Sequence, residues 1–167
     1  ILYSHSQGFF LRDIKSDNII IDLLENAILI DFNYSKKIDT SDNEIKTVGF
    51  GSLFYIAPEI LNSNKYTYKV DSYSVGLIIH FIITGMKYNI NYEHKKEKNI
   101  SEIQEFPKCP KEYEYIFNIY KRCFESSPEL RPDIIELIIG ILFNFNYSEL
   151  NNIKIEYIYP NLIKEFK

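Results

Sequence analysis

Residues 12–33 read RDIKSDNIIIDLLENAILIDFN, a polar run followed by two short apolar runs and a second polar run. The apolar runs, 19–21 and 27–30, are separated by a turn-prone stretch, and this pattern predicts a β-hairpin. An antiparallel hairpin returns the chain to its starting point. We therefore expect Asn18, before the first strand, and Asp31, after the second strand, to lie next to each other.

The polar side chains around this hairpin have the chemistry of phosphoryl transfer. The side-chain oxygens of Asn18 and Asp31 are hard ligands of the kind that Mg²⁺ binds. Asp13 lies in the same short loop as Asn18, and Lys15 lies between them, where its positive charge can reach a transferring phosphoryl group. A base, metal ligands and a cation are what phosphoryl transfer requires. The alternative is that the Asp and Asn residues only form turns and that the lysine is only solvated.

The rest of the chain has mostly helical patterns. Residues 1–8 fit the last turns of a helix that stops at Gly8. Residues 70–84 are apolar nearly all round, as in a helix buried on every side. Residues 113–124 place their apolar side chains on one helical face, and Pro132 fits the first position of a further helix that runs to residue 141.

Five short motifs occur in the order in which eukaryotic-type protein kinases carry them. They are RDIKSDN at 12–18, DFN at 31–33, APE at 57–59 with Gly51-Ser52 before it, DSYSVG at 71–76 and RP at 131–132. Over about residues 1–142 the chain resembles the C-terminal lobe of that family. The Tyr-Ser pair at 73–74 and the segment 123–132 are closest to the tyrosine-kinase-like serine/threonine kinases.

This resemblance implies a mostly α-helical α+β fold, a kinase C-terminal lobe with a small catalytic β-hairpin. It implies that residues 1–145 form the partial kinase domain and that residues 146–167 are a tail with no assigned role. The sequence begins at Ile1 and carries no glycine-rich loop, no strand lysine and no helix glutamate for the ATP phosphates. We expect the N-terminal lobe to lie upstream of this fragment and the fragment to be inactive by itself.

The resemblance also implies catalytic roles. Asp13 would orient and deprotonate the substrate hydroxyl, and Lys15 would steady the γ-phosphate of ATP. Asn18 and Asp31 would bind ATP through the magnesium ion that both hold. A lysine at position 15 points to serine/threonine protein substrates, since tyrosine kinases usually differ there.

Further residues would bind the cofactor or support the site. Ile20 would form the floor beneath the adenine, and Ser52 would hydrogen-bond near the catalytic aspartate and lysine. Asp71 would anchor the backbone of the catalytic loop. Glu59 and Arg131 would form a buried ion pair, which is costly to break because one charge then stays buried alone.

Composition limits the other possible functions. The chain has 167 residues, 46% of them apolar, which suits one domain with a real core. Its net charge of −4 gives no support to nucleic-acid binding, and its longest apolar stretches fall short of a membrane span. Cys109 and Cys123 are too few for a disulfide framework and suit a reducing, cytoplasmic location.

Two departures from the family pattern leave a second hypothesis open. Leu11 replaces the usual histidine before Arg-Asp, and Asn33 replaces the glycine of Asp-Phe-Gly. Leucine keeps apolar packing against Phe32, and asparagine tolerates a positive φ better than most residues. The first hypothesis is an active kinase that uses Mg-ATP. The alternative is a pseudokinase, a binding or scaffold module without turnover.

The polar stretch 31–55 predicts a long loop, and long loops in compact domains are usually functional. Arg12 precedes Asp13 as in kinases that are switched by phosphorylation of this loop. Thr47 is the candidate phosphorylation site, because a phosphate there could bond to Arg12. The alternative is that Thr47 is unmodified and that Arg12 pairs with a carboxylate such as Glu44.

Overall fold

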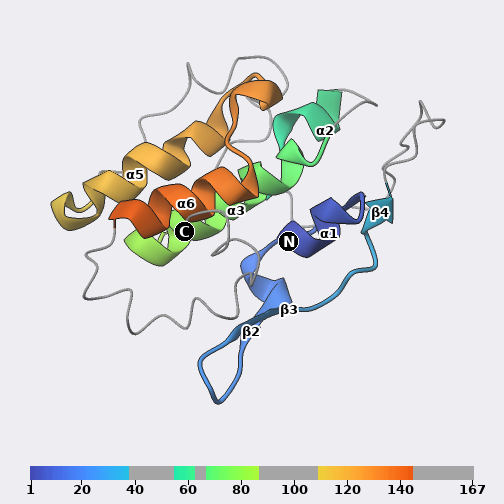
Figure 1. Cartoon of the computed structure of the whole chain (residues 1–167), viewed down its shortest axis with the longest axis horizontal. Coiled ribbons are helices and arrows are strands. Elements are labelled where there is room, and N and C mark those ends of the chain that lie inside the picture. Colours follow the sequence, from blue (N-terminus) through green and yellow to red (C-terminus); the bar gives the residue numbers. More distant parts are fainter. Residues whose placement is uncertain (38–54, 63–66, 87–108, 145–167) are drawn as a thin grey trace, which may run out of the picture.

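The computed structural model of the chain describes residues 1–37, 55–62, 67–86 and 109–144, and helices make up more than half of these residues (Figure 1). The α-helices are α1 (Leu2–Ser6), α2 (Pro58–Asn62), α3 (Lys69–Thr84), α5 (Glu114–Tyr120) and α6 (Ile134–Asn144). The 3-10 helices are η1 (Ser16–Asn18), η3 (Lys111–Tyr113), η4 (Lys121–Phe124) and η5 (Pro128–Leu130). None of the α-helices within these ranges is both long and apolar enough to cross a membrane.

The strands form two small antiparallel sheets. In the hairpin, β2 (Ile19–Ile21) pairs with β3 (Ala27–Leu29), with Ile20 opposite Ile28, so the predicted hairpin is confirmed. Figure 1 shows it extending away from the helices. The second sheet pairs β1 (Phe9–Phe10) with β4 (Lys36–Lys37). Strand β4 lies inside the stretch 31–55 that was predicted to be a loop. Strands of two residues are too short to show a period in the sequence, so this pairing was missed.

Helix α3 runs through the centre of the core. Its first three turns are buried nearly all round, but near its end Ile82 is 74% exposed, so the prediction of burial on every side is wrong there. The helix ends at Gly85, whose φ of +69° is the left-handed conformation that favours glycine at a helix end. Gly76 is required for packing, because a Cβ there would lie 2.5 Å from the Cβ of Cys123.

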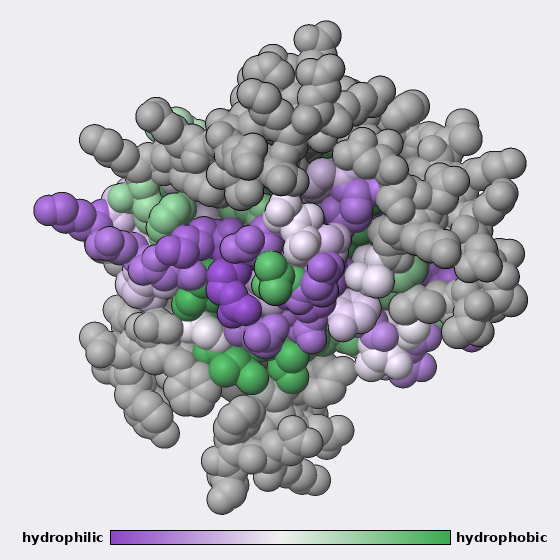
Figure 2. Space-filling model, turned by 90° about the horizontal axis from the view of Figure 1, so that it is seen from above, coloured by the Kyte–Doolittle hydropathy of each residue, from purple (hydrophilic) through white to green (hydrophobic). Residues whose placement is uncertain are grey.

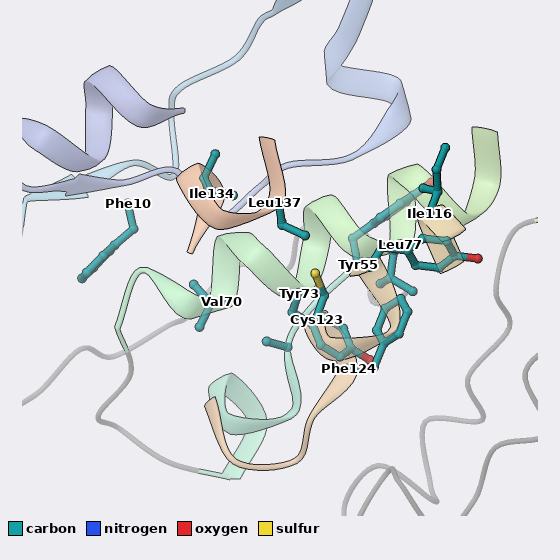
Figure 3. Close-up of a cluster of buried hydrophobic side chains, with 12 residues drawn as sticks. Phe10, Tyr55, Val70, Tyr73, Leu77, Ile116, Cys123, Phe124, Ile134 and Leu137 are labelled. Atoms are coloured by element: carbon teal, nitrogen blue, oxygen red, sulfur yellow. The ribbon is translucent and has the colours of Figure 1, made fainter. Parts of the chain in front are cut away.

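The core between α3, α5 and η4 is rich in aromatic side chains (Figure 3). Tyr73, Tyr120 and Phe124 are buried and meet edge to face, with ring centroids 5.6 and 6.2 Å from the Phe124 ring. Such contacts favour one arrangement of the rings beyond the free energy of burying them. Seen from above, the coloured part of the hydropathy surface carries both hydrophilic and hydrophobic residues (Figure 2).

Two predicted helices differ in their bounds. Residues 113–124 are α-helical only over α5, with 3-10 turns on either side. Ile116, Tyr120, Cys123 and Phe124 are buried as expected, whereas Tyr113 is exposed. The helix predicted to open at Pro132 begins at Ile134 instead. Asp133 caps it: its N–H donates to Glu136 Oε2 at 2.8 Å, and its carbonyl accepts from Leu137. The Glu136 side chain thus bonds back to the N–H that precedes the helix, which stabilises a helix start after Asp133 and leaves Pro132 outside the helix.

The N-terminal segment agrees with the sequence analysis. α1 ends at Ser6, and Gly8 has a φ of +76° while its N–H donates to the carbonyl of His5. The chain therefore turns sharply at Gly8 and enters β1. This turn brings Leu11 and the polar loop after it against the start of α3.

Candidate functional site

The loop from Leu11 to Asn18 is fixed at its start by a buried carboxylate. Asp71, on the first turn of α3, is fully buried, and its two oxygens accept the backbone N–H groups of Leu11 and Arg12, both at 2.8 Å. The Oδ2 atom also lies 2.8 Å from Nε2 of His5. The predicted anchoring role of Asp71 agrees with these contacts. The contact of His5 was missed, because scattered histidines give no signal in a sequence.

Arg12 has a φ of +64°, a left-handed conformation that is uncommon for a residue with a side chain. Its backbone is held there by Asp71, and its Nε donates to the carbonyl of Tyr34 at 2.6 Å. Such strain persists where the surroundings impose it. Arg12 therefore links the start of the loop to the segment that follows the hairpin. Its predicted partners Thr47 and Glu44 lie outside the described residues.

Three of the predicted site residues come together around the carboxylate of Asp13. Asp13 is 8% exposed, and its Oδ2 accepts from Lys15 Nζ at 2.7 Å and from Asn18 Nδ2 at 2.8 Å. Asn18 Nδ2 also donates to the carbonyl of Asp13 at 2.9 Å. Charge-assisted hydrogen bonds of this length are strong and hold the carboxylate in one orientation. Both of these donors bond to Oδ2, and neither bonds to Oδ1 of Asp13.

Asp31 follows β3, and the hairpin brings the ends of its two strands together. The N–H of Ile30 donates to the carbonyl of Asn18 at 2.8 Å, so the backbone before β2 lies beside the backbone after β3. Asp31 has a φ of +62°, and its Oδ1 accepts the N–H of Asn33 at 3.2 Å. The positive φ thus falls on Asp31 and not on Asn33. The backbone at position 33 therefore does not need a residue that tolerates a positive φ.

The donor set suits a magnesium ion. The amide nitrogen of Asn18 is turned toward Asp13, which leaves its Oδ1 as the atom that can ligate a cation. Asp31 is exposed and offers a carboxylate. Within the described ranges no group of three His, Cys, Asp or Glu side chains could hold a metal by itself. Two oxygen ligands are consistent with Mg²⁺, which usually completes its shell with water and substrate phosphates.

The proposed adenine floor is an apolar face of the hairpin. Ile20 is 47% exposed and lies opposite Ile28, which is 40% exposed. Directly paired residues point to the same side of a sheet, so the two side chains form one apolar surface. Ser52, the other proposed cofactor residue, lies outside the described residues. Phe32 is 53% exposed, and Leu11, expected to pack against it, is buried.

The ion pair between Glu59 and Arg131 is confirmed. Nη1 and Nη2 of Arg131 donate to the two carboxylate oxygens at 2.6 and 2.8 Å. Arg131 is 1% exposed, donates from Nε to the carbonyl of Glu125 at 2.9 Å, and lies 5.1 Å from the ring centroid of Tyr73. The arrangement satisfies the guanidinium in the way that a buried charge requires.

Lys69 completes this cluster and was not singled out from the sequence. Its Nζ donates to the carbonyl of Arg131 at 2.6 Å and forms an ion pair with Asp133. The lysine therefore joins the first turn of α3 to the residues before α6. No spacing rule in the sequence relates residue 69 to residue 131, so this contact could not be predicted and is found only in the folded structure.

The contacts described above join residues of the five motifs. Comparison with known proteins agrees with the family resemblance that these motifs indicate. Residues 1–144 match the family model of the protein kinase domain. The chain belongs to the protein kinase family. Its helix-rich architecture with a small hairpin is consistent with the kinase fold.

Curated relatives carry kinase names. The chain is 32% identical over 154 residues to the RGS domain-containing serine/threonine-protein kinase A of Dictyostelium discoideum, covering 90% of this chain and 13% of that protein. It is 33% identical over 144 residues to the human dual specificity testis-specific protein kinase 2, covering 81% and 24%. It is 31% identical over 140 residues to the serine/threonine-protein kinase STE20 of Eremothecium gossypii, covering 81% and 14%. The chain thus spans less than a quarter of the length of these relatives.

Proposed function

We propose that this kinase chain carries the phosphoryl-transfer site of a serine/threonine protein kinase, which moves the γ-phosphoryl group of ATP to a hydroxyl of a protein substrate. The observation that carries the proposal is the arrangement around Asp13. A nearly buried carboxylate is oriented by a lysine at 2.7 Å and by an asparagine at 2.8 Å, and its second oxygen is left to accept a proton.

Each residue has a distinct task in this proposal. Asp13 orients the substrate hydroxyl and accepts its proton. Lys15 places a positive charge where negative charge gathers on the transferring group. Asn18 and Asp31 would hold Mg²⁺, which supplies further positive charge to the phosphates when it is bound with ATP.

Two further features bear on substrate binding. Ile20 offers an apolar surface for the adenine ring, and Ser52 is proposed to bond beside the catalytic loop. The lysine at position 15 favours serine and threonine hydroxyls. Because one relative is named a dual specificity kinase, tyrosine substrates belong in the assay as well.

The experiment uses the full-length protein that contains this chain, with Mg-ATP and serine, threonine and tyrosine peptides. We expect Asp13→Asn to lower turnover by about 100-fold or more, because asparagine keeps the shape but cannot accept the proton. Its melting temperature should stay close to that of the unaltered protein. Asp17→Asn is the matched control, since Asp17 lies in the same loop but is exposed.

The outcomes separate the proposal from the pseudokinase alternative. Full activity in the Asp13 variant removes Asp13 from the catalytic role. No transfer by the unaltered full-length protein, together with retained folding, favours a scaffold without turnover. The replacement of the usual histidine by Leu11 and of the usual glycine by Asn33 is the observation that keeps this alternative in view.

A further inference from the structure

A hydrogen bond links the middle of the catalytic loop to a residue far along the chain. Ser16 Oγ lies 3.0 Å from the hydroxyl of Tyr55, 39 positions later. Ser16 opens the 3-10 turn η1 and stands between Lys15 and Asn18, both of which bond to Asp13. The contact therefore holds the part of the loop that carries Lys15 and the proposed metal ligand Asn18.

Tyr55 is itself firmly held. Its side chain is 7% exposed and belongs to the buried core, where Figure 3 shows it beside α3. Its backbone carbonyl accepts a hydrogen bond from Ser74 Oγ at 2.8 Å, and Ser74 is 4% exposed. A ring fixed at its backbone and along its apolar faces presents its hydroxyl at a defined point.

The helix that fixes Tyr55 is also the helix that fixes the start of the catalytic loop. Asp71 of α3 accepts the N–H groups of Leu11 and Arg12, and Ser74 lies three residues later on the same helix. Residues three apart lie on the same side of a helix. The catalytic loop is thus tied to α3 directly at its start and through Tyr55 at Ser16.

We propose that Tyr55 is a positioning residue for the catalytic loop and that its hydroxyl sets the placement of Lys15 and Asn18 relative to Asp13. The proposal rests on the proposed function for its catalytic consequence. Tyr55 does not touch the reacting groups; it acts through Ser16. Both side chains are needed for the link, so removing either hydroxyl has the same effect as removing both.

The first arm of the experiment measures the link without any catalysis. Amide hydrogen exchange of the chain is compared for the unaltered protein, Tyr55→Phe, Ser16→Ala and the double variant. The N–H of Asn18, which donates to the carbonyl of Lys15 at 3.0 Å, should exchange about threefold to tenfold faster in all three variants. Tyr3→Phe is the matched control, because Tyr3 is 71% exposed.

The second arm measures single-turnover phosphoryl transfer in the full-length protein. Tyr55→Phe and Ser16→Ala should each lower the transfer rate by about threefold to tenfold, with KM for ATP and the melting temperature nearly unchanged. The double variant should lose no more than either single variant. Ser16→Thr, which keeps a hydroxyl, should restore the rate.

The outcomes distinguish the two proposals. Unchanged exchange at Asn18 in both single variants overturns the link, whatever the rate of transfer. Faster exchange with an unchanged transfer rate overturns the positioning role and leaves the kinase assignment intact. If the unaltered full-length protein transfers no phosphate, the proposed function fails and the catalytic consequence fails with it, while the exchange arm still decides whether the link exists.

Discussion

At the scale of single residues, Arg131 shows how a buried charge is made tolerable. Its guanidinium donates to both oxygens of Glu59, to the carbonyl of Glu125 and, at 3.3 Å, to the carbonyl of Lys69. It also lies over the ring of Tyr73. Because the pair is desolvated, its attraction is offset by the free energy of removing both charges from water. The pair matters for stability chiefly because removing only one partner leaves the other charge buried and unpaired.

We expect Glu59→Ala and Arg131→Ala each to lower the free energy of unfolding by about 3–5 kcal/mol, because either leaves a buried charge unpaired. Replacement of both by alanine should cost less than the sum of the two single replacements. Urea unfolding of the four proteins measures this. Arg122→Ala is the control, because Arg122 and Glu136 are both about half exposed and their charged atoms lie 4.0 Å apart. Removing this ion pair should cost less than about 1 kcal/mol. Strictly additive losses in the cycle would show that Glu59 and Arg131 do not interact.

At the scale of elements, α3 determines much of the architecture because different sides of it meet different segments. Asp71 and Ser74 bond to the catalytic loop and to Tyr55, Gly76 meets Cys123, and His80 meets Tyr120. The apolar pattern of residues 70–84 predicted the helix and its burial, but a nearly all-round pattern has no period that tells which side meets which partner. The hairpin was more predictable, since its short apolar runs and turn fix its pairing locally.

The close approach at Gly76 gives a prediction about packing. A methyl group there would lie 2.5 Å from the Cβ of Cys123, an atom fixed to the backbone. We expect Gly76→Ala to lower the free energy of unfolding by about 1–3 kcal/mol in spite of the better helix propensity of alanine. Gly140→Ala is the control, because its nearest neighbour is a side-chain methyl of Ile119 at 3.1 Å, which can shift. Equal effects in denaturant unfolding would contradict a rigid contact at Gly76.

His80 gives α3 a dependence on pH. It is fully buried, and its Nδ1 lies 3.1 Å from the hydroxyl of Tyr120, whose pKa burial raises. Burial lowers the pKa of His80 below its usual value of 6.5. The imidazole of His80 therefore takes up a proton less readily in the folded state than in the unfolded state. As the pH falls below about 6.5, protonation of His80 in the unfolded state lowers the stability of the folded state.

We expect the free energy of unfolding to fall faster below pH 6.5 in the unaltered chain than in His80→Gln, by up to about 1.4 kcal/mol per pH unit for one proton. Glutamine keeps a hydrogen-bonding group but does not titrate. The measurement is urea unfolding between pH 5 and 8, where His5 and the carboxylates are common to both proteins. Parallel pH profiles would mean that His80 takes up no proton on unfolding.

At the scale of the whole molecule, the order of the motifs predicted contacts that no local pattern could give. Asp71 meets Leu11 across 60 positions, and Glu59 meets Arg131 across 72. These pairs were predictable because the motifs belong to a family with a known arrangement. The link from Ser16 to Tyr55 was not, because the motif at 12–18 assigns Ser16 no partner and Tyr55 lies outside the five motifs. Its existence depends on both segments being placed against α3.

The activity of the chain by itself is the prediction that depends on the whole molecule. Ile20 and Ile28 form an apolar surface that remains 47% and 40% exposed, so an adenine ring resting on it would have protein on one side only. Phosphoryl transfer requires that the site hold the phosphates in place and exclude water. In the proposed site, Lys15, Asn18 and Asp31 would hold the phosphates only from the side of the loop and the hairpin.

We therefore expect the 167-residue chain, incubated with labelled ATP, magnesium and a generic serine/threonine substrate, to transfer no phosphate above the level of its Asp13→Asn variant. The full-length protein, assayed beside it, should show transfer that depends on Asp13. If the full-length protein is active, a lack of activity in a folded sample of the isolated chain would show that the catalytic loop and the one apolar surface do not hold Mg-ATP well enough for transfer. Robust transfer by the folded chain alone would mean that the loop and hairpin suffice to hold Mg-ATP, and the requirement for a second lobe would be wrong.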